Sequence, residues 1–531
     1  MARLALAMSV SPLTQKRWEY DELGRNTRRA RMADPASTAA VNPAVDRVTD
    51  LAYDGGSDRV DTETTFVGNP AQSRTTEYAY DDIGRLILVT DAEGNTETRT
   101  YTVHNQVATK SIAEPPLAAR AYTYGYDDVG RITSEVASGP PALTTTYAYD
   151  AVGRRTRTVD AKGVATTYAY NAFGDQTWLT EDADGAAPRQ TESQFDQLGH
   201  LTLQRTWDGE GLTETTTYQN DQLGRRTRID FCDGGAWVYV YDDAGRMTQR
   251  TDPRLQVTAY THNWRGQVLT KRVGGQLVES FGYTPLGWRT LAERDASNRV
   301  TFLHDAFGQV TSETQTVAGV GKTVTHTYNQ AGDRTLLVYP TDAGVTLAFG
   351  HDGLGQVTAI QRGGQVLAEY GYAGRFATDR AVRTTSATAT WIRRHVGYDV
   401  HRRQSLITNS ADVGGIVTEL DRHEYTHDAV GNRLTADISG AAAIADSVSY
   451  GYDDLHRLTS AAYDADSSDE VFDYDLLGNR LSYADRASAT TTYLHNCVNE
   501  YTSITPGAVA PLHDDAGNLT RTETGYALAY D

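Results

Sequence analysis

A repeated unit of 21 to 26 residues is the feature of this sequence that most constrains its fold. Between residues 241 and 309, four copies follow one another at a spacing of 21 residues, opening at Tyr241, His262, Tyr283 and His304. A glycine stands four residues after each opener, at Gly245, Gly266, Gly287 and Gly308. An aromatic residue stands two residues before each opener, at Tyr239, Tyr260, Phe281 and Phe302. Self-similarity at a fixed period of this length is typical of solenoids, propellers and related arrays.

The same unit, whose fullest form is Y-D-x-x-G-R, recurs along almost the whole chain, in about twenty copies. We interpret its recurring residues as a structural signature, best seen at Tyr80, Asp81, Gly84 and Arg85; Tyr126, Asp127, Gly130 and Arg131; Tyr149, Asp150, Gly153 and Arg154; Tyr241, Asp242, Gly245 and Arg246; and Tyr474, Asp475 and Gly478. Residues 27–75 are the exception, because only Tyr53 resembles an opener there and residues 33–45 are rich in Pro and Ala. We expect an insertion or loop in that segment.

Each unit predicts two strands and two turns. Thr and Tyr alternate before the opener, as in residues 144–150, and this period of two indicates a strand. The Asp then accepts backbone N–H groups, and the Gly takes the positive φ that closes a hairpin loop. A second turn follows about nine residues later, for example at residues 160–163. The sequence therefore predicts an all-β antiparallel meander of about forty strands with essentially no helix.

The width of such a sheet restricts its architecture. A twisted sheet of about forty strands cannot stay open and flat, so it must coil, either into propeller blades or into a continuous spiral that encloses a volume. The hydrophobic fraction is 39%, and Tyr numbers 32 against 10 Phe. This composition favours a single-layer wall with two partly polar faces over a filled core.

The repeated unit resembles the YD repeat of the RHS family, which includes bacterial RHS polymorphic toxins, the C component of Tc toxin complexes, wall-associated proteins and the animal teneurins. The resemblance covers residues 15–531, with residues 1–14 as a short N-terminal segment. It implies a hollow spiral β-shell that encloses cargo, which in the bacterial members is usually a toxic C-terminal domain of the same polypeptide. This chain ends at Asp531 within a repeat and lacks the family's D-P-x-G-L cleavage segment, so we expect a truncated wall without its cargo and assign no autoproteolysis.

Net charge and hydropathy limit the kinds of partner and the cellular location that we expect for this chain. The net charge is −20 without acidic blocks, which disfavours nucleic acid as a partner. No apolar run approaches the ~20 residues of a membrane span, and the N-terminus is not a convincing signal peptide. By its resemblance to the family, we expect a bacterial protein that is secreted or held at the cell surface.

Several short motifs suggest chemistry, but each has a simpler interpretation. Residues 423–427 match H-E-x-x-H, yet they alternate as a strand, and two His four residues apart on a strand lie about 13 Å apart, too far to share a zinc ion. Residues 319–323 lack the first glycine of a P-loop and predict a hairpin tip. Residues 464–470 fail the calcium-loop pattern at its sharp turn. Two cysteines, Cys232 and Cys497, cannot form a disulfide framework or a zinc site, and we interpret both as ordinary wall residues. We therefore predict no catalytic residue, no metal and no cofactor.

Two functions remain. The leading hypothesis is a non-catalytic shell segment that encapsulates a C-terminal toxin cargo, with secretion or delivery machinery as a further partner. The alternative is a cell-surface scaffold for adhesion or carbohydrate binding, because rows of Tyr and Asp can bind glycans. Regular occurrence of the Tyr in every unit favours a structural ladder.

Overall fold

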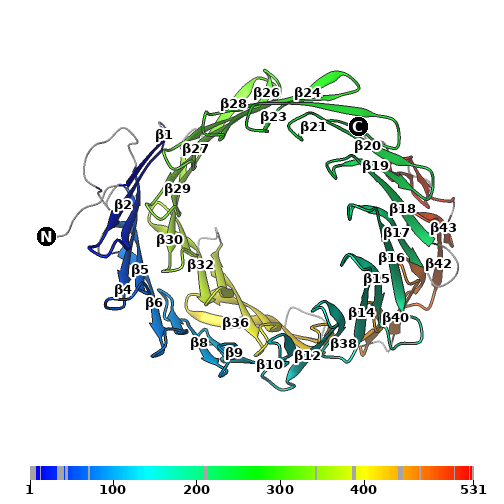
Figure 1. Ribbon diagram of the computed structural model, residues 1–531, viewed down its shortest axis with the longest axis horizontal. Helices are drawn as coiled ribbons and strands as arrows, with labels where there is room; N and C mark the ends of the chain where they lie inside the picture. Colours follow the sequence, from blue (N-terminus) through cyan, green and yellow to red (C-terminus); the bar gives the residue numbers. More distant parts are fainter. Residues whose placement is uncertain are drawn as a thin grey trace. The chain divides into compact units, whose positions relative to one another are not determined.

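The computed structural model describes residues 7–11, 14–32, 41, 46–69, 72–207, 213–340, 344–384, 390–440, 446–465, 468–507, 509–524 and 527–528. These residues form β-strands joined by short turns, with no helix among them. Strands adjacent in sequence pair antiparallel, as β12 (Leu143–Tyr149) does with β13 (Arg155–Val159). The strands β1 to β43 belong to one sheet, and β44 and β45 form a separate two-stranded sheet. The predicted all-β meander is confirmed (Figure 1).

The chain divides into two compact units, each built from two separate stretches of sequence. Unit 1 contains Met1–Thr123 and Glu279–Leu420, and unit 2 contains Tyr124–Val278 and Asp421–Asp531. We call the earlier stretch of each unit its first row and the later stretch its second row.

The first row of unit 1 contains β1 (Ala7–Ser11), β2 (Thr14–Tyr20), β3 (Asn26–Arg31), β4 (Arg47–Tyr53), β5 (Val60–Asn69), β6 (Gln72–Tyr80), β7 (Leu86–Thr90), β8 (Thr96–Tyr101), β9 (Val107–Ala113) and the start of β10 (Arg120–Tyr126). Its second row contains the end of β24 (Gln276–Tyr283), then β25 (Arg289–Asp295), β26 (Asn298–His304), β27 (Val310–Val317), β28 (Val320–Tyr328), β29 (Arg334–Tyr339), β30 (Val345–His351), β31 (Val357–Arg362), β32 (Gln365–Ala373), β33 (Phe376–Arg383), β34 (Thr390–Tyr398), β35 (Gln404–Val413) and the start of β36 (Ile416–His427).

After β10, the first row of unit 2 contains β11 (Ile132–Ala137), β12, β13, β14 (Ala165–Tyr170), β15 (Gln176–Glu181), β16 (Arg189–Phe195), β17 (Leu201–Trp207), β18 (Thr213–Asn220), β19 (Arg226–Phe231), β20 (Ala236–Tyr241), β21 (Met247–Thr251), β22 (Val257–His262) and β23 (Val268–Val273), and it ends within β24. After β36, its second row contains β37 (Arg433–Ser439), β38 (Asp446–Tyr452), β39 (Leu458–Tyr463), β40 (Ser468–Tyr474), β41 (Arg480–Ala484), β42 (Thr490–His495), β43 (Tyr501–Thr505), β44 (Leu512–His513) and β45 (Leu519–Arg521).

The alternating Thr and Tyr residues form the strands they predict. Along β12 the side chains alternate between half-buried and exposed, with Tyr147 and Tyr149 on the half-buried face. The pairing register shifts at the opener, since Ala148 pairs with Arg157 but Tyr149 pairs with Arg155. This β-bulge recurs at the openers of other repeats, for instance between Val240 and Tyr241. A bulge bends the strand and increases its local twist, so a bulge in many repeats favours a coiled sheet over a flat one.

Residues 27–75 differ from the expected insertion or loop. The segment contains most of β3, all of β4 and β5, and the first residues of β6, with β4 pairing to β5 from Thr49–Thr65 to Tyr53–Val60. Tyr53 is an opener like the others, because its hydroxyl donates to the backbone oxygen of Asn26 at 2.7 Å. Most of the Pro/Ala-rich stretch, residues 33–40 and 42–45, lies outside the described residues. The turn after Tyr53 lacks the Y-D-x-x-G spacing, which is why the sequence pattern obscures this repeat.

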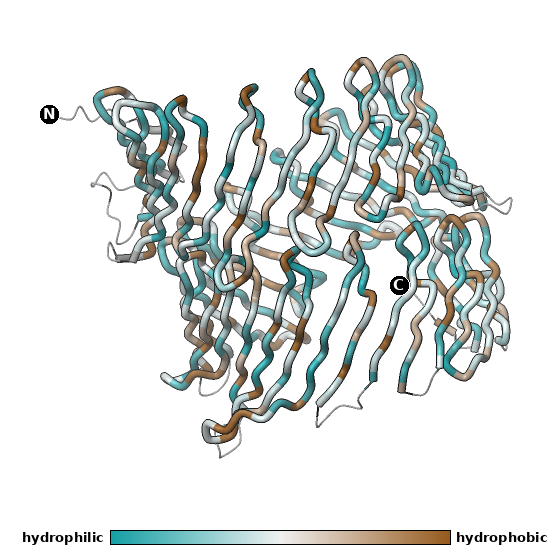
Figure 2. Tube along the Cα trace, turned by 90° about the horizontal axis from the view of Figure 1, so that it is seen from below, coloured by the Kyte–Doolittle hydropathy of each residue, from teal (hydrophilic) through white to brown (hydrophobic). Residues whose placement is uncertain are grey.

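The apolar core is thin. Among the described residues, the buried apolar side chains are mostly small, such as Ala165, Ala373 and Ala461, and the largest that is fully buried is Val48. Polar and apolar positions are mixed along the strands, with no long apolar run (Figure 2). Hydrogen bonds between strands and side-chain contacts between repeats therefore carry more of the stability than in a domain with a filled core. None of the described residues forms a helix of the length and apolar character needed to cross a membrane.

Candidate functional site: the repeat turns and the seams between rows

The Tyr of each repeat is hydrogen-bonded to the preceding repeat. The hydroxyl of Tyr149 donates to the backbone oxygen of Ile132 at 2.8 Å. Tyr80 and Tyr241 donate in the same way, each at 2.9 Å, to the backbone oxygens of Val60 and Arg226. Burial raises the pKa of Tyr80 above its usual value, so this hydroxyl keeps the proton that the hydrogen bond requires.

The Asp and Gly of the repeat build the turn that follows the Tyr, which we call the YD turn. Asp150 Oδ1 accepts the backbone N–H groups of Val152 at 3.1 Å and Arg154 at 2.9 Å, while its Oδ2 accepts Arg154 Nε at 2.7 Å. Gly153 has a φ of 93°, a left-handed conformation that glycine adopts without steric cost. The same contacts recur at Asp81, Asp127 and Asp242. At Asp475 an asparagine, Asn479, replaces the arginine and donates through its amide at 2.8 Å.

Hydrogen bonds to these carboxylates lower their pKa values. The guanidinium of Arg246 donates to Asp242 and lowers its pKa, with a further contribution from the Arg246 backbone N–H. At Asp81 the backbone N–H of Arg85 lowers the pKa most, and the Arg85 guanidinium adds to the effect. The YD turns are therefore held by ionised carboxylates.

The Arg of each repeat contacts the following repeat. Arg154 donates to the backbone oxygen of Asn171 at 2.8 Å, and its guanidinium lies 4.8 Å from the ring centroid of Tyr170, the next opener. Arg131 makes the same pair of contacts with Asp150 and Tyr149, at 2.9 Å and 4.9 Å. Arg246 donates to Asn263 at 2.7 Å. The YD turns along one edge of the sheet are thus linked one to the next.

A second set of contacts joins the two rows of each unit, and we call each set a seam. In unit 1, Arg47 and Arg31 lie over the ring of Phe307, at 4.3 Å and 5.5 Å from its centroid. Arg74 forms an ion pair of 2.5 Å with Asp333, in which both side chains are mostly buried. These partners are 259 to 276 residues apart in sequence, so the second row of unit 1 lies alongside its first row.

The seam of unit 1 also contains Glu93, which accepts the backbone N–H of Gly353 at 2.5 Å. It ends at Glu114, which pairs with Arg402 at 3.0 Å with only 3% of the Arg402 side chain exposed. In every one of these contacts the second-row residue belongs to a YD turn or lies next to one. The first-row residues Arg31, Arg47, Arg74, Glu93 and Glu114 lie at the opposite ends of their strands, in or near the second turns.

The seam of unit 2 has the same polarity, since YD turns of its second row again meet second turns of its first row. His456 of the second row lies 2.9 Å from Asp160 of the first row, Arg254 lies 3.1 Å from Asp514, and Lys162 lies 3.8 Å from Asp428. Burial, together with the nearby carboxylate of Asp454, raises the pKa of Asp182. This proximity of like charges opposes closure of the seam.

Two seam residues replace the glycine of a YD turn. Arg402 and His456 have φ values of 65° and 64°, a conformation that costs a residue with a Cβ about 1 kcal/mol or more. Each uses its side chain to reach the first row, Arg402 to Glu114 and His456 to Asp160. Sequence reasoning missed both contacts, although the signal was present, because each residue stands where the repeat expects Gly.

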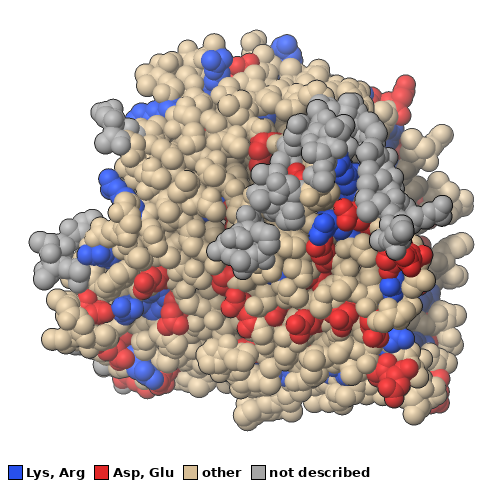
Figure 3. Space-filling model, turned by 90° about the vertical axis from the view of Figure 1, so that its left-hand side faces the viewer, with Lys and Arg blue, Asp and Glu red and all other residues tan. Residues whose placement is uncertain are grey.

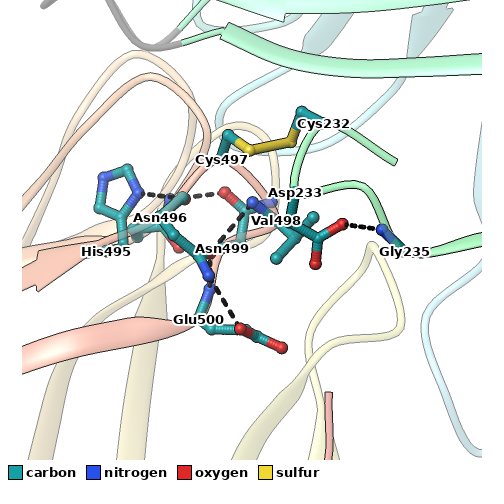
Figure 4. Close-up of a disulfide and its surroundings, with 10 residues drawn as sticks. Cys232, Asp233, Gly235, His495, Asn496, Cys497, Val498, Asn499 and Glu500 are labelled. Atoms are coloured by element: carbon teal, nitrogen blue, oxygen red, sulfur yellow. Dashed lines mark hydrogen bonds between the residues drawn. A yellow bond between two sulfur atoms is a disulfide. The ribbon is translucent and has the colours of Figure 1, made fainter. Parts of the chain in front are cut away.

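A disulfide between Cys232 and Cys497 crosses the seam of unit 2 (Figure 4). Cys232 lies in the second turn between β19 and β20, and Cys497 lies in the YD turn between β42 and β43. Their Cα atoms are 6.0 Å apart, although 265 residues separate them in sequence. The interpretation of the two cysteines as ordinary wall residues is therefore wrong. It failed because sequence spacing does not reveal which turns of successive coils meet.

The motifs that suggested chemistry lie within the sheet or its turns. Residues 423–427 belong to β36, where His423 pairs with Ile438 and His427 with Arg433, so the strand interpretation is confirmed. Residues 319–323 form the tip and start of the β27–β28 hairpin, as predicted. In residues 464–470, the two central positions lie outside the described residues. Among the described residues, no three His, Cys, Asp or Glu side chains are grouped closely enough to hold a metal ion.

Charged side chains are interspersed on the face drawn in Figure 3, where acidic and basic groups lie close to one another and most atoms are uncharged. Many are paired within one turn or strand pair, as Arg28 is with Asp50 at 2.5 Å and Arg25 is with Asp21 at 2.6 Å. These paired charges stabilise the sheet, and because opposite charges alternate they create no strong electrostatic field that would attract a charged ligand.

Comparison with known proteins supports the fold and the repeat. Residues 149–187 and 221–257 match the family model of the RHS repeat. The fold is similar to the crystal structure of TcdB2-TccC3, with a TM-score of 0.59 and 13% identity over 97% of this chain and 36% of that one. It is also similar to a Photorhabdus luminescens Tc holotoxin pore that carries a TccC3 mutation, with a TM-score of 0.52 and 15% identity over 99% of this chain and 28% of that one.

This chain spans about a third of the length of the solved chains it matches. No curated protein matches it in sequence. The repeat model and the shared fold agree with the Y-D-x-x-G-R units, their turn geometry and the return of the meander along its own edge. The chain therefore contains RHS repeats at residues 149–187 and 221–257, and its β-sheet fold is similar to that of the TcdB2-TccC3 structure.

Proposed function

We propose that this chain is a wall segment of a toxin-associated RHS shell that encloses a polypeptide cargo and performs no chemistry itself. The observation that carries the proposal is the pair of seams, in which second turns of the first row meet YD turns of the second row. A meander that locks onto its own previous coil forms a continuous wall, whereas a meander used only for display has no need of such contacts.

The mechanism we propose is steric. Hydrogen-bonded strands lie about 4.8 Å apart, which leaves no passage for a polypeptide or a protease between them. The seams are held by side-chain contacts and one disulfide instead of a ladder of backbone hydrogen bonds. A wall of this kind can therefore open along its seams. The partners would be a toxin cargo, normally a later part of the same polypeptide, and the machinery that secretes or delivers it. We place such a protein outside the cell or at its surface.

Protease protection tests this proposal. An unstructured, protease-sensitive reporter is fused after Asp531 of the full chain, and its cleavage rate is compared with that of the free reporter. We expect at least tenfold slower cleavage. A variant that weakens the seam of unit 2, Cys232→Ser with Arg254→Ala, should restore fast cleavage. The matched control is Arg157→Ala, which removes an exposed pair with Asp184 that lies within one row. Equal cleavage of fused and free reporter would refute encapsulation.

The alternative function, glycan binding by the Tyr rows, has less support. Arg side chains cover the rings of many repeat tyrosines, for example Arg131 over Tyr149 and Arg457 over Tyr474 at 5.1 Å, and a covered ring cannot stack on a sugar. Trp178 is different, because it is 37% exposed and stacks on Trp207 at 5.5 Å between ring centroids. Glycan-array binding that Trp178→Ala abolishes would favour the scaffold hypothesis.

A further inference from the structure

The seam of unit 1 shows what the central residues of a YD turn do when they meet a second-turn edge. Ala306 and Phe307 are the central residues of the turn after His304. The backbone oxygen of Ala306 accepts Arg31 at 3.1 Å, and the Phe307 ring lies beneath Arg47 and Arg31. An apolar tip in contact with cations is therefore part of the docking chemistry of this fold.

The first row of unit 1 has the same kind of tips on its own YD turns, and among the described residues they are exposed. Leu23, Ile83 and Val103 are central residues of its YD turns, and they are 65%, 68% and 93% exposed. Exposed carboxylates lie at Glu22 and Asp82 on two of these turns, and at Asp54 and Asp58 on the turn after Tyr53. We call this acidic and apolar edge the YD edge of unit 1. Isolated exposed apolar residues are ordinary, but a regular row at equivalent positions marks an interaction surface.

The opposite edge of unit 1 is formed by the second turns of its second row. Each of these strands connects a YD turn at one end to a second turn at the other, so this edge faces away from the seam. Its exposed apolar residues are Val317, Val320, Val413, Ile416 and Val417, which are 45% to 72% exposed. Its exposed cations are Arg294, Arg299, Lys322 and Arg362, against the exposed carboxylates Asp295 and Glu419. Among the described residues, this edge is basic and apolar.

We propose that unit 1 docks head-to-tail onto a second copy of this chain, with the YD edge of one copy against the second-turn edge of the next. The two edges are complementary in charge, both contain apolar tips, and they face in opposite directions. The contact would repeat the polarity of the internal seam, in which YD turns meet second turns. Each copy retains one free edge after pairing, so the interaction is heterologous and can extend into a column.

Sedimentation velocity on the full chain tests the docking, because it resolves monomers, dimers and longer columns. We expect association that increases with concentration and weakens at high salt, since carboxylates and cations meet at the contact. Ile83→Asp places a charge on the YD edge, and Ile416→Asp places one on the second-turn edge. Each variant alone should be monomeric, because one of its two edges is blocked.

A mixture of the two variants separates this proposal from nonspecific association. The intact second-turn edge of the Ile83→Asp chain can pair with the intact YD edge of the Ile416→Asp chain, so a 1:1 mixture should form dimers and nothing longer. The matched control is Leu303→Asp, a change of similar size at a 67% exposed position on the face of β26, which should associate like the parent. Circular dichroism checks that each variant keeps its fold.

Three results would overturn the proposal. The parent chain could stay monomeric at low salt and high concentration. Either edge variant could associate like the parent, which would place the contact elsewhere. The mixture could remain monomeric although the parent associates, which would exclude a head-to-tail contact between these two edges.

Discussion

Arg402 and Glu114 form a buried ion pair of 3.0 Å between turns that are 288 residues apart in sequence. Arg402 occupies the glycine position of its YD turn with a φ of 65°, so the chain tolerates a strained backbone at the point where this side chain reaches the first row. The backbone conformation and the ion pair can be separated by mutation.

Replacing Arg402 by glycine or alanine distinguishes the two effects. Both changes leave Glu114 buried without its partner, which costs about 3 kcal/mol. Arg402→Ala also retains a Cβ at positive φ, so it should be about 1 kcal/mol less stable than Arg402→Gly. Hydrogen exchange of the turn Asp399–Arg403 measures the local free energy of opening. Equal stability of the two variants would show that the turn relaxes out of the left-handed conformation. Adding Glu114→Gln should recover part of the loss.

The disulfide should hold the seam of unit 2 under oxidising conditions. A non-reduced tryptic digest should contain a cross-linked peptide pair that includes Cys232 and Cys497, and reduction should lower the urea midpoint of unit 2, because the bond closes a long loop worth up to about 5 kcal/mol. The double variant Cys232→Ser/Cys497→Ser should show the reduced midpoint with or without reductant. Titration of two free thiols in the folded, unreduced protein would contradict the pairing.

The repeat arginine should contribute more stability than an exposed arginine on the neighbouring strand. Arg154 contacts Asp150, the Asn171 backbone oxygen and the Tyr170 ring, so Arg154→Ala should cost about 2 kcal/mol. Arg157→Ala removes only an exposed pair and should cost less than about 1 kcal/mol. Arg154→Lys should behave nearly like Arg154→Ala, since an ammonium cannot make these contacts at once. Urea unfolding, monitored by hydrogen exchange at Asn171 and Asp175, measures the difference in stability between these variants. A lysine variant as stable as the parent would show that the simultaneous contacts of the Arg154 guanidinium are not needed.

The protein should lose stability in acid. Hydrogen bonds from Arg246 and Arg85 lower the pKa values of Asp242 and Asp81 in the folded state. A carboxyl whose folded pKa lies below its unfolded value near about 4 contributes stability above that value, and the contribution is lost as the pH falls through the folded pKa. The urea midpoint should therefore stay level down to about pH 5 and fall below about pH 4. In Asp242→Asn the exchange protection of that turn should depend less on pH. A midpoint that stays constant from pH 7 to pH 3 would contradict this linkage.

The strands and turns were predictable because the residues within each repeat determine them through short-range interactions. The Thr and Tyr alternation determines a strand, and the Asp and Gly determine the turn through contacts no more than four residues apart, such as Asp150 with Arg154. A zinc site at residues 423–427 could be rejected from the local sequence in the same way, because the strand pattern along β36 places the two His too far apart to share a metal ion. Where the local signal was incomplete, as around Tyr53, the prediction of a loop differed from the strands observed.

The sequence by itself determined the repeat, its two strands and two turns, and the antiparallel meander, because these depend on interactions between near neighbours. Only the tertiary structure decided that Cys232 meets Cys497, that Arg402 meets Glu114 and that Phe307 lies beneath Arg47. Those pairings depend on which turns of the two rows meet. That register is the sum of small twists and bulges over many strands, and no single repeat encodes it.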